Sequence, residues 1–195
     1  MVVVVLAGTM IGGVFALLSW MTRGKLTLDA GVGRSFHRLG PVTVVIDAPR
    51  DVVFEQLSAP YLGRAPRALA DTLEVLEWGS DIVVARHRSR VGFWTAETVE
   101  SVRFEAPERI SFRHLRGPVP HALETFELSE HDGSTELVYR GELGIDFWVL
   151  GRLAGRYWVT PTWLSIVEGH LADTKSTAEA RAEARRRRQA QPQEH

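Results

Sequence analysis

Four polar side chains of this chain fall on otherwise apolar faces of predicted strands, and they are the first candidates for chemistry. They are Glu100, His114, Glu124 and Tyr139. Side chains alternate between the two faces of a strand, so a polar residue that shares a face with apolar neighbours is predicted to be buried with them. A buried charge needs a partner or a ligand. A carboxyl or imidazole group beside a cavity could also move a proton at a carbon next to a carbonyl.

Aromatic residues on the same faces are the predicted wall of such a cavity. Trp94, Phe112 and Phe126 lie on the apolar sides of three strand patterns, and Tyr157 lies on a later helical stripe. The predicted ligand-binding set is therefore Trp94, Glu100, Phe112, His114, Glu124, Phe126, Tyr139 and Tyr157. A register error of one residue would turn any of these strands over.

Each polar candidate also has an ordinary structural explanation. His114 lies near a strand end, where an imidazole is often exposed or already hydrogen-bonded. Glu100 and Glu124 could sit at an edge or bulge, or pair with arginines. Tyr139 could be a core ring whose hydroxyl reaches water or the backbone. The sequence leaves both explanations open for each residue.

Other kinds of site are not predicted. The chain has no cysteine, which excludes disulfides, thiolate metal sites and a cysteine nucleophile. No metalloprotease, nucleophile-elbow or phosphate-loop motif occurs, so we expect no metal and no cofactor. Gly31-Val32-Gly33 begins a dinucleotide fingerprint, but Phe36 replaces its third glycine and no hydrophobic strand precedes it.

The net charge of −1 is unevenly distributed, with an acidic middle between two basic ends. Phosphate binding needs a basic face on the folded part of a protein. The distribution therefore argues against a nucleic-acid partner.

The elements that would position these side chains follow from the hydrophobic period. "VTVVIDAPRDVVFEQLS" over 42–58 passes from strand alternation directly into a short helix, with Pro49 in its first turn. A second short helix or turn follows in "APYLGRAPRA". About six strands then run from residue 71 to residue 145, with hairpin signals at Gly79-Ser80 and at the turn around Gly133.

The last third returns to a helical period. A stripe of Leu150, Leu153, Tyr157, Leu164, Val167 and Leu171 predicts one long helix with a kink at Pro161. The tail over 181–195 is basic and predicted to be disordered. A curved antiparallel sheet with one apolar face must bury that face, and we expect this long helix to pack against it. The predicted class is α+β.

The N-terminus carries no charged side chain from Val2 to Thr22. About 20 apolar residues span a hydrocarbon core of roughly 30 Å, so residues 1–22 are predicted to be a transmembrane helix. Residues 23–41 would be a linker. Basic residues follow the span and none precede it, which places the domain in the cytoplasm and the protein in the cell membrane as a single-pass protein. Arg23, Lys25 and Arg185, Arg186, Arg187, Arg188 are candidates for contact with anionic headgroups.

Over residues 42–180 the chain resembles the SRPBCC, or START-like, superfamily, in particular its polyketide cyclase/dehydrase-like branch. The resemblance lies in the opening "VTVVIDAPRDVVFEQLS", in "AETVESVRFEAPERISFRHLRGP" with its Pro-x-Arg-Ile-x-Phe core, in "FELSEHDGSTELVYRGEL" and in "WVLGRLAGRYW". It implies a helix-grip architecture, in which the sheet wraps around the C-terminal helix and encloses an apolar cavity. Members bind lipids, sterols, polyketides and hormones, and a minority catalyse cyclisation.

Three hypotheses follow. The first is a membrane-anchored binding domain for a lipid or another hydrophobic small molecule. The second is an accessory subunit that uses the span and the domain surface to join a larger membrane protein complex. The third is an enzyme of the cyclase or aromatase type, which would use Glu100, Glu124 or His114 as acid–base groups.

Overall fold

The computed structural model describes residues 29–63, 71–91 and 94–190, with residues 91 and 94 by backbone only, and the isolated positions 13, 16, 19, 20 and 27. The strands are β1 (Ser35–Ile46), β2 (Leu73–Trp78), β3 (Ile82–Val91), β4 (Trp94–Glu105), β5 (Arg109–Arg116), β6 (His121–His131) and β7 (Ser134–Ile145). The helices are α2 (Arg50–Ser58), the 3-10 helix η1 (Ala59–Leu62), α3 (Trp148–Ala154), the π-helical segment η3 (Gly155–Val159) and α4 (Thr160–Ala190).

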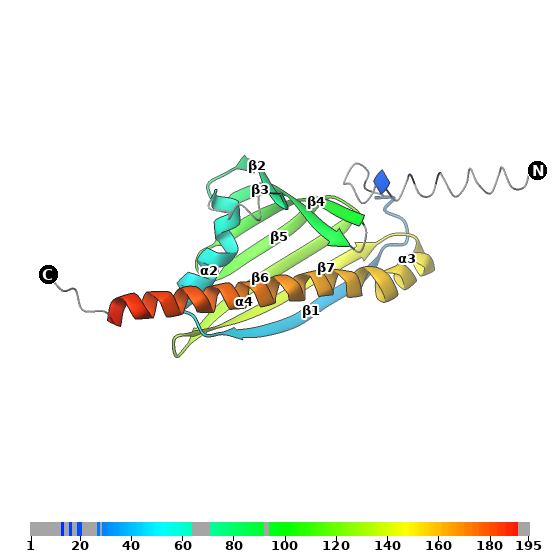
Figure 1. Cartoon of the computed structure of the whole chain (residues 1–195). Helices are drawn as coiled ribbons and strands as arrows, with labels where there is room; N and C mark the ends of the chain where they lie inside the picture. Colours follow the sequence, from blue (N-terminus) through cyan, green and yellow to red (C-terminus); the bar gives the residue numbers. More distant parts are fainter. Residues whose placement is uncertain are drawn as a thin grey trace, which may run out of the picture.

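The seven strands form one antiparallel sheet in the order β1-β7-β6-β5-β4-β3-β2. The helix α4 lies along one face of this sheet, and α2 lies near the C-terminal half of α4 (Figure 1). This arrangement is the predicted α+β helix-grip architecture. The core lies between the sheet and α4, with buried Leu137, Leu143, Val167 and Leu171 contributed from both sides.

The direct passage from the first strand into a helix is confirmed. The amides of Val52 and Val53 donate to the carbonyl of Pro49, which precedes α2. The buried face of α2 carries Val52, Val53 and Phe54. Burial of this face holds α2 and η1 at one end of the sheet, opposite the end that carries α3 (Figure 1).

The first strand is longer than its prediction. The sequence pattern assigns residues 35–41 to the linker, but β1 begins at Ser35, which pairs with Ile145 of β7. The pairing is interrupted between Leu39 and Val42, where Gly40 has a φ of 77°. Gly40 and Pro41 are typical of a turn or linker, so the sequence pattern does not indicate a strand here. In the structure, β7 pairs with β1 on both sides of the irregularity.

The C-terminal region differs from its prediction in two ways. The helix changes to π-helical hydrogen bonding over η3, and Pro161 follows this segment directly as the second residue of α4. The predicted disordered tail is helical as far as Ala190. In this region Arg186 contacts Asp47, between β1 and α2, and Arg185 contacts Asp51 in the first turn of α2.

The predicted transmembrane helix lies mostly outside the described residues, as do Arg23 and Lys25. Gly13, Ala16, Ser19 and Trp20 are helical. Within the described part of the chain, no helix is both long and apolar enough to cross a bilayer.

Candidate functional site

The side of the sheet that faces α4 is lined by alternate residues of the strands. The sequence placed Glu100, Phe112, Glu124, Phe126 and Tyr139 on this side, and the structure confirms each placement. Their neighbours on the same faces, Val102, Ile110, Leu128, Leu137 and Leu143, are buried. A mostly apolar surface therefore surrounds a small number of polar groups.

A row of aromatic rings crosses this surface. The ring centroids of Tyr139 and Phe126 lie 5.1 Å apart, and those of Phe126 and Phe112 lie 5.5 Å apart. Tyr61, from η1, continues the row at 5.9 Å from Phe112 and 5.8 Å from Phe104. Tilted and edge-on contacts at these distances are favourable, so the rings form a continuous apolar wall across neighbouring strands.

Glu124 is the polar centre of this wall. Its Oε1 accepts a hydrogen bond of 2.5 Å from the hydroxyl of Tyr139 and one of 2.9 Å from Nε1 of Trp163 on α4. The second carboxyl oxygen, Oε2, has no hydrogen-bond partner among the described residues. Because both donors bind Oε1, Oε2 is the atom that can carry a proton or meet a ligand.

The surroundings of Glu124 favour its neutral form. Burial, and then the negative charge of Glu100, raise the pKa of Glu124 to about 7, against the opposing hydrogen bonds from Trp163 and Tyr139. Burial and the neighbouring Glu124 also raise the pKa of Tyr139, so its hydroxyl stays protonated and acts as the donor. Near neutral pH, Glu124 can therefore either give or take a proton.

A second cluster of polar side chains is centred on Glu100 of β4. Oε2 of Glu100 lies 3.6 Å from Nε2 of His87, and Oε1 lies 3.8 Å from Nδ1 of His114. The hydroxyl of Tyr61 lies 3.4 Å from the same His87 nitrogen. Burial raises the pKa of Glu100, but His114 and His87 outweigh this effect and the net pKa is lowered. Near neutral pH Glu100 is therefore ionised, whereas Glu124 is close to the midpoint of its titration.

The imidazole of His114 is buried although its ring nitrogens lack hydrogen-bond partners among the described residues. Its side chain is 1% exposed, and neither ring nitrogen has a hydrogen-bond partner within the described part of the chain. A Cβ at Gly117 would lie 2.6 Å from Cε1 of His114, so this glycine is what admits the ring. Buried polar atoms without partners are uncommon and call for a ligand, a water molecule or a function.

Several inward-facing side chains keep some accessible surface. Phe104, Phe112, Glu124, Phe126 and Trp163 are half-buried although they lie between the sheet and α4. His170 on α4 is more exposed. Its pKa is nevertheless lowered, first by partial desolvation of its ring and then by the charge of His87. These side chains therefore combine packing against the core with some accessible surface.

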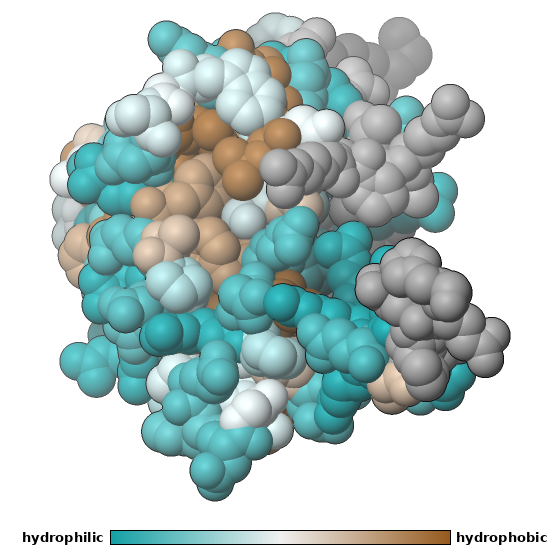
Figure 2. Space-filling model, turned by 90° about the vertical axis from the view of Figure 1, so that its left-hand side faces the viewer, coloured by the Kyte–Doolittle hydropathy of each residue, from teal (hydrophilic) through white to brown (hydrophobic). Residues whose placement is uncertain are grey.

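The end of the molecule formed by α2 and β2 has apolar surface framed by polar side chains (Figure 2). Exposed Leu62 of η1 and Leu76 of β2 belong to this end.

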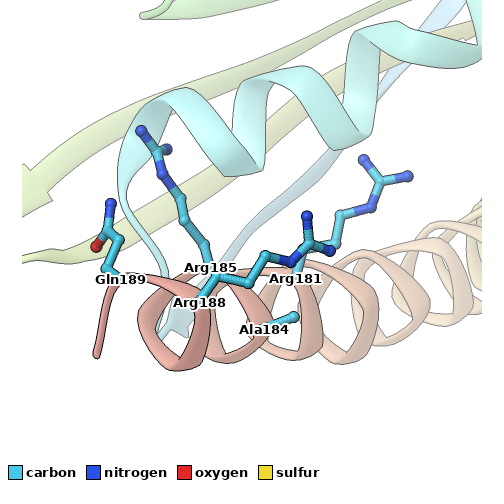
Figure 3. Close-up of a pocket in the computed structure, with 5 residues that line it drawn as sticks. All are labelled: Arg181, Ala184, Arg185, Arg188 and Gln189. Carbon is cyan, nitrogen blue, oxygen red and sulfur yellow. The ribbon is translucent and has the colours of Figure 1, made fainter. Parts of the chain in front are cut away.

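The predicted headgroup-binding arginines lie at the C-terminal end of α4. A shallow hollow there has a volume of about 360 Å³ and is lined by Arg181, Ala184, Arg185, Arg188 and Gln189 (Figure 3). Arg185 donates to Asp51, Arg186 to Asp47, and Arg187 pairs with Glu183. Three of the four arginines are therefore engaged with carboxylates of the same chain, and this reduces their availability to lipid.

No family model matches the sequence, and no curated protein matches it. Solved structures do match the fold. A protein from Thermus thermophilus is 18% identical, with a TM-score of 0.60 over 76% of this chain and 99% of its own. The ZhuI aromatase/cyclase from a Streptomyces species is 21% identical, with a TM-score of 0.54 over 78% and 95%. Norcoclaurine synthase from Thalictrum flavum is 14% identical, with a TM-score of 0.56 over 74% and 87%. The shared feature is the helix-grip fold.

The helix-grip fold brings most of the sequence-predicted site residues together, in two groups. Glu124, Tyr139 and Phe126 form one, and Glu100 and His114 belong to the other. Tyr157 is a correction, since its side chain is 70% exposed on η3 and faces away from the concave side. Trp94 is the first residue of β4, and its side chain lies outside what the structure describes.

Four residues of the site were not predicted from the sequence, namely His87, Tyr61, Trp163 and His170. His87 shares a face of β3 with buried Val83 and Ala85, so strand alternation could have found it. Trp163 and His170 lie next to Leu164 and Leu171 on the helical stripe. Their neighbours across the site depend on how α4 is rotated, which the sequence does not show. Among the described residues, no group of three histidines or carboxylates could hold a metal ion.

Proposed function

We propose that this chain is a binding domain for a hydrophobic small molecule, held between the concave side of the sheet and α4. The observation that carries the proposal is Oε2 of Glu124, which has no hydrogen-bond partner in the described part of the chain and lies within the aromatic wall of Phe112, Phe126 and Tyr139. Binding sites for small molecules are mostly apolar, with a few polar groups that fix the orientation of the ligand. Glu124 meets that description.

The chemistry of the site defines the class of ligand. Flat or extended apolar molecules fit against a row of tilted rings. A neutral carboxyl donates one hydrogen bond through its O–H, so a carbonyl or hydroxyl oxygen is the matching ligand group. We therefore propose a polycyclic or isoprenoid molecule with at least one oxygen function. The polyketide aromatase/cyclases among the structures of like fold are in keeping with this class.

Membrane anchoring is the second part of the proposal. It is supported by the absence of charged side chains from Val2 to Thr22 and by Arg23 and Lys25 directly after this segment. An anchor would keep the domain beside a membrane, where apolar ligands partition. The domain would then lie on the cytoplasmic side.

Quenching of Trp163 tests the binding proposal, because its indole nitrogen contacts Glu124. The full chain is placed in lipid nanodiscs and titrated with 1,8-dihydroxyanthraquinone while tryptophan fluorescence is recorded. We expect saturable quenching that Trp163→Phe removes. Trp78→Phe, which removes an exposed tryptophan on β2, should keep it. Quenching that does not saturate, or that is identical in both variants, would contradict the proposal.

An enzyme of the cyclase type is the second candidate, favoured by the divergent pKa values of Glu100 and Glu124. Two carboxyls whose surroundings separate their pKa values can act as base and acid in one reaction. Such a pair would exchange the protons next to the carbonyl of 1-tetralone for deuterium. Exchange that is faster than in buffer and is lost in Glu124→Gln would favour the enzyme, whereas binding without exchange would favour the carrier.

A further inference from the structure

The segment formed by α3 and η3 presents its large apolar side chains to the outside of the molecule. The exposed residues are Phe147, Trp148, Val149, Leu150, Leu153, Tyr157 and Trp158, and we call them the α3 patch. Leu150 is 74% exposed, although a leucine on a short helix is ordinarily its packing residue. Apolar patches of this kind on a folded domain mark interaction sites.

The inward side of the same segment is made of glycine. A Cβ at Gly151 would lie 1.8 Å from the carbonyl oxygen of Asp146, and a Cβ at Gly155 would lie 2.2 Å from Nε2 of His37. Both glycines are buried. The segment therefore lies close to β1 at Gly155 and close to the backbone at the end of β7 at Gly151, and its amphipathic order is the reverse of that of a core-packing helix.

The backbone before the patch is fixed in an unusual conformation. Phe147 and Trp148 have φ values of 79° and 46°, in a region that residues other than glycine rarely adopt. Their amides donate to the carbonyls of Val32 and Gly33, and the Trp148 ring lies directly on Gly33. These contacts hold the patch outward instead of letting it fold back onto the domain.

The charge of the segment is positive only. Between Phe147 and Val167 the charged residues are Arg152 and Arg156, and the guanidinium of Arg156 lies 5.5 Å from the ring centre of Tyr157. The nearest carboxylate in sequence, Asp146, is buried and paired with Arg34. Tryptophan, tyrosine, leucine and arginine on one short helix are the composition of a segment that lies at a bilayer surface.

The patch also lies where the N-terminal segment reaches the domain. The amides of Ala30 and Gly31 each donate a hydrogen bond of 2.8 Å to Asp146, two residues before α3. The uncharged stretch from Val2 to Thr22 therefore precedes residues that are fixed beside the patch. A bilayer reached by that stretch would meet α3 and not the opposite end of the sheet.

We propose that the α3 patch inserts into the interfacial layer of an anionic lipid bilayer, with Arg152 and Arg156 at the headgroups. The domain then stands with the end of β7 and α3 towards the membrane and the turn between β6 and β7 away from it. This inference concerns the outer surface and shares with the proposed function only its membrane setting.

Spin labels on the full chain test the proposal, and the absence of cysteine makes each label unique. Leu150→Cys and Leu153→Cys place labels on the patch. His131→Cys is the control. His131 is the last residue of β6 and pairs with Ser134 at the start of β7, whereas α3 follows the other end of β7 at Ile145. Each variant is labelled in nanodiscs of phosphatidylcholine and phosphatidylglycerol. We expect both patch labels to collide several-fold more with oxygen, relative to a water-soluble nickel complex, than the label at position 131.

Equal access of the nickel complex to all three positions would overturn the proposal. Shielding of the patch by a second copy would also overturn it, and would appear as spin–spin broadening that dilution with unlabelled protein removes. Cover by the N-terminal segment would overturn it too, and would appear as a short distance between labels in the double variant Leu17→Cys/Leu153→Cys. Quenching of Trp163 in the same nanodiscs shows separately whether the ligand site works, so failure of one proposal is distinguishable from failure of the other.

Discussion

At the scale of single residues, the site depends on how Glu124 is protonated. Both hydrogen bonds from the protein arrive at Oε1, so the proton of the neutral form resides on Oε2 and is available to a ligand oxygen. Ionised Glu100 on β4, which β5 separates from β6, supports this state, because a second negative charge nearby is unfavourable. The two carboxyls therefore divide the roles of charge and donor between them.

This division makes stability depend on pH. The pKa of Glu124 is raised from its ordinary value of 4.5 to about 7, so its contribution to stability is complete below about pH 4.5 and is lost as the pH rises through 7. The raised pKa corresponds to on the order of 3 kcal/mol. Glu124→Gln keeps the shape and donor of the neutral acid, so we expect the variant to be more stable than the parent at pH 9 and about equal at pH 5, by urea denaturation.

Glu127→Gln is the matched control on the same strand. Glu127 lies on the outer face, paired with Arg140, and is exposed. Its substitution should change stability little at either pH. A Glu124→Gln variant whose stability runs parallel to that of the parent from pH 5 to pH 9 would show that Glu124 is ionised throughout.

The sequence could predict which face of a strand a residue occupies but not which residues meet across strands. Period-two alternation placed Glu100, Glu124 and Tyr139 inward. The meeting of Glu100 with His87 and His114 depends on the β3–β4 and β4–β5 registers and on a bulge after Val99. No local pattern specifies those offsets, so the Glu100 cluster was not predicted.

At the scale of elements, the helical stripe was right over α4 and wrong over α3. Leu164, Val167 and Leu171 face the sheet, whereas Leu150 and Leu153 face outward. The helical period of this segment was predicted correctly, but the side of the helix that packs against the domain was not. Gly151 and Gly155 form that side because they let the helix come closer to the sheet than a leucine would allow. The π-helical residues of η3 then change the rotation before α4 begins.

Replacement of glycine tests this packing. Gly151→Ala places a methyl group against the backbone of Asp146, so we expect a loss of about 1–3 kcal/mol in the free energy of unfolding. At Gly169 on α4, no described atom lies within 4 Å of the place that a methyl group would take, and Gly169→Ala should stabilise by about 0.5–1 kcal/mol. Thermal denaturation measures both. Equal effects of the two substitutions would contradict the close approach of α3 to the strand end.

At the scale of the whole molecule, the order of elements was predictable because each junction has a local signal. Proline opens α2, and Gly79 and Gly133 mark the hairpin turns. The start of β1 was missed because Gly40 and the next proline resemble a linker, while the partner strand β7 lies about 100 residues later in the chain. The outward α3 patch was missed for a related reason, since its orientation depends on long-range contacts with Val32, Gly33 and His37.

Asp146 joins these distant parts of the chain. Its carboxylate accepts hydrogen bonds from the amides of Ala30 and Gly31 and one of 2.7 Å from Nε of Arg34, across separations of 112 to 116 residues. Arg34 lowers the pKa of Asp146 against the opposing effect of burial, and the two amides lower it further. The stability from this cluster is present above the ordinary pKa of 3.8 and is lost as the pH falls through the lowered value.

Asp146→Asn replaces one of the two acceptor oxygens of this carboxylate with an NH2 group, which faces the hydrogen-bond donors of Ala30, Gly31 and Arg34. We expect a loss of about 1–3 kcal/mol at pH 7, because at least one buried donor is left without an acceptor. The difference from the parent should shrink on acidification below about pH 4, where the parent loses the same interactions. Asp132→Asn, in the exposed turn between β6 and β7, is the control and should behave as the parent does. A constant difference between Asp146→Asn and the parent down to about pH 2 would mean that Asp146 is not the group through which acid loosens the N-terminal segment from α3.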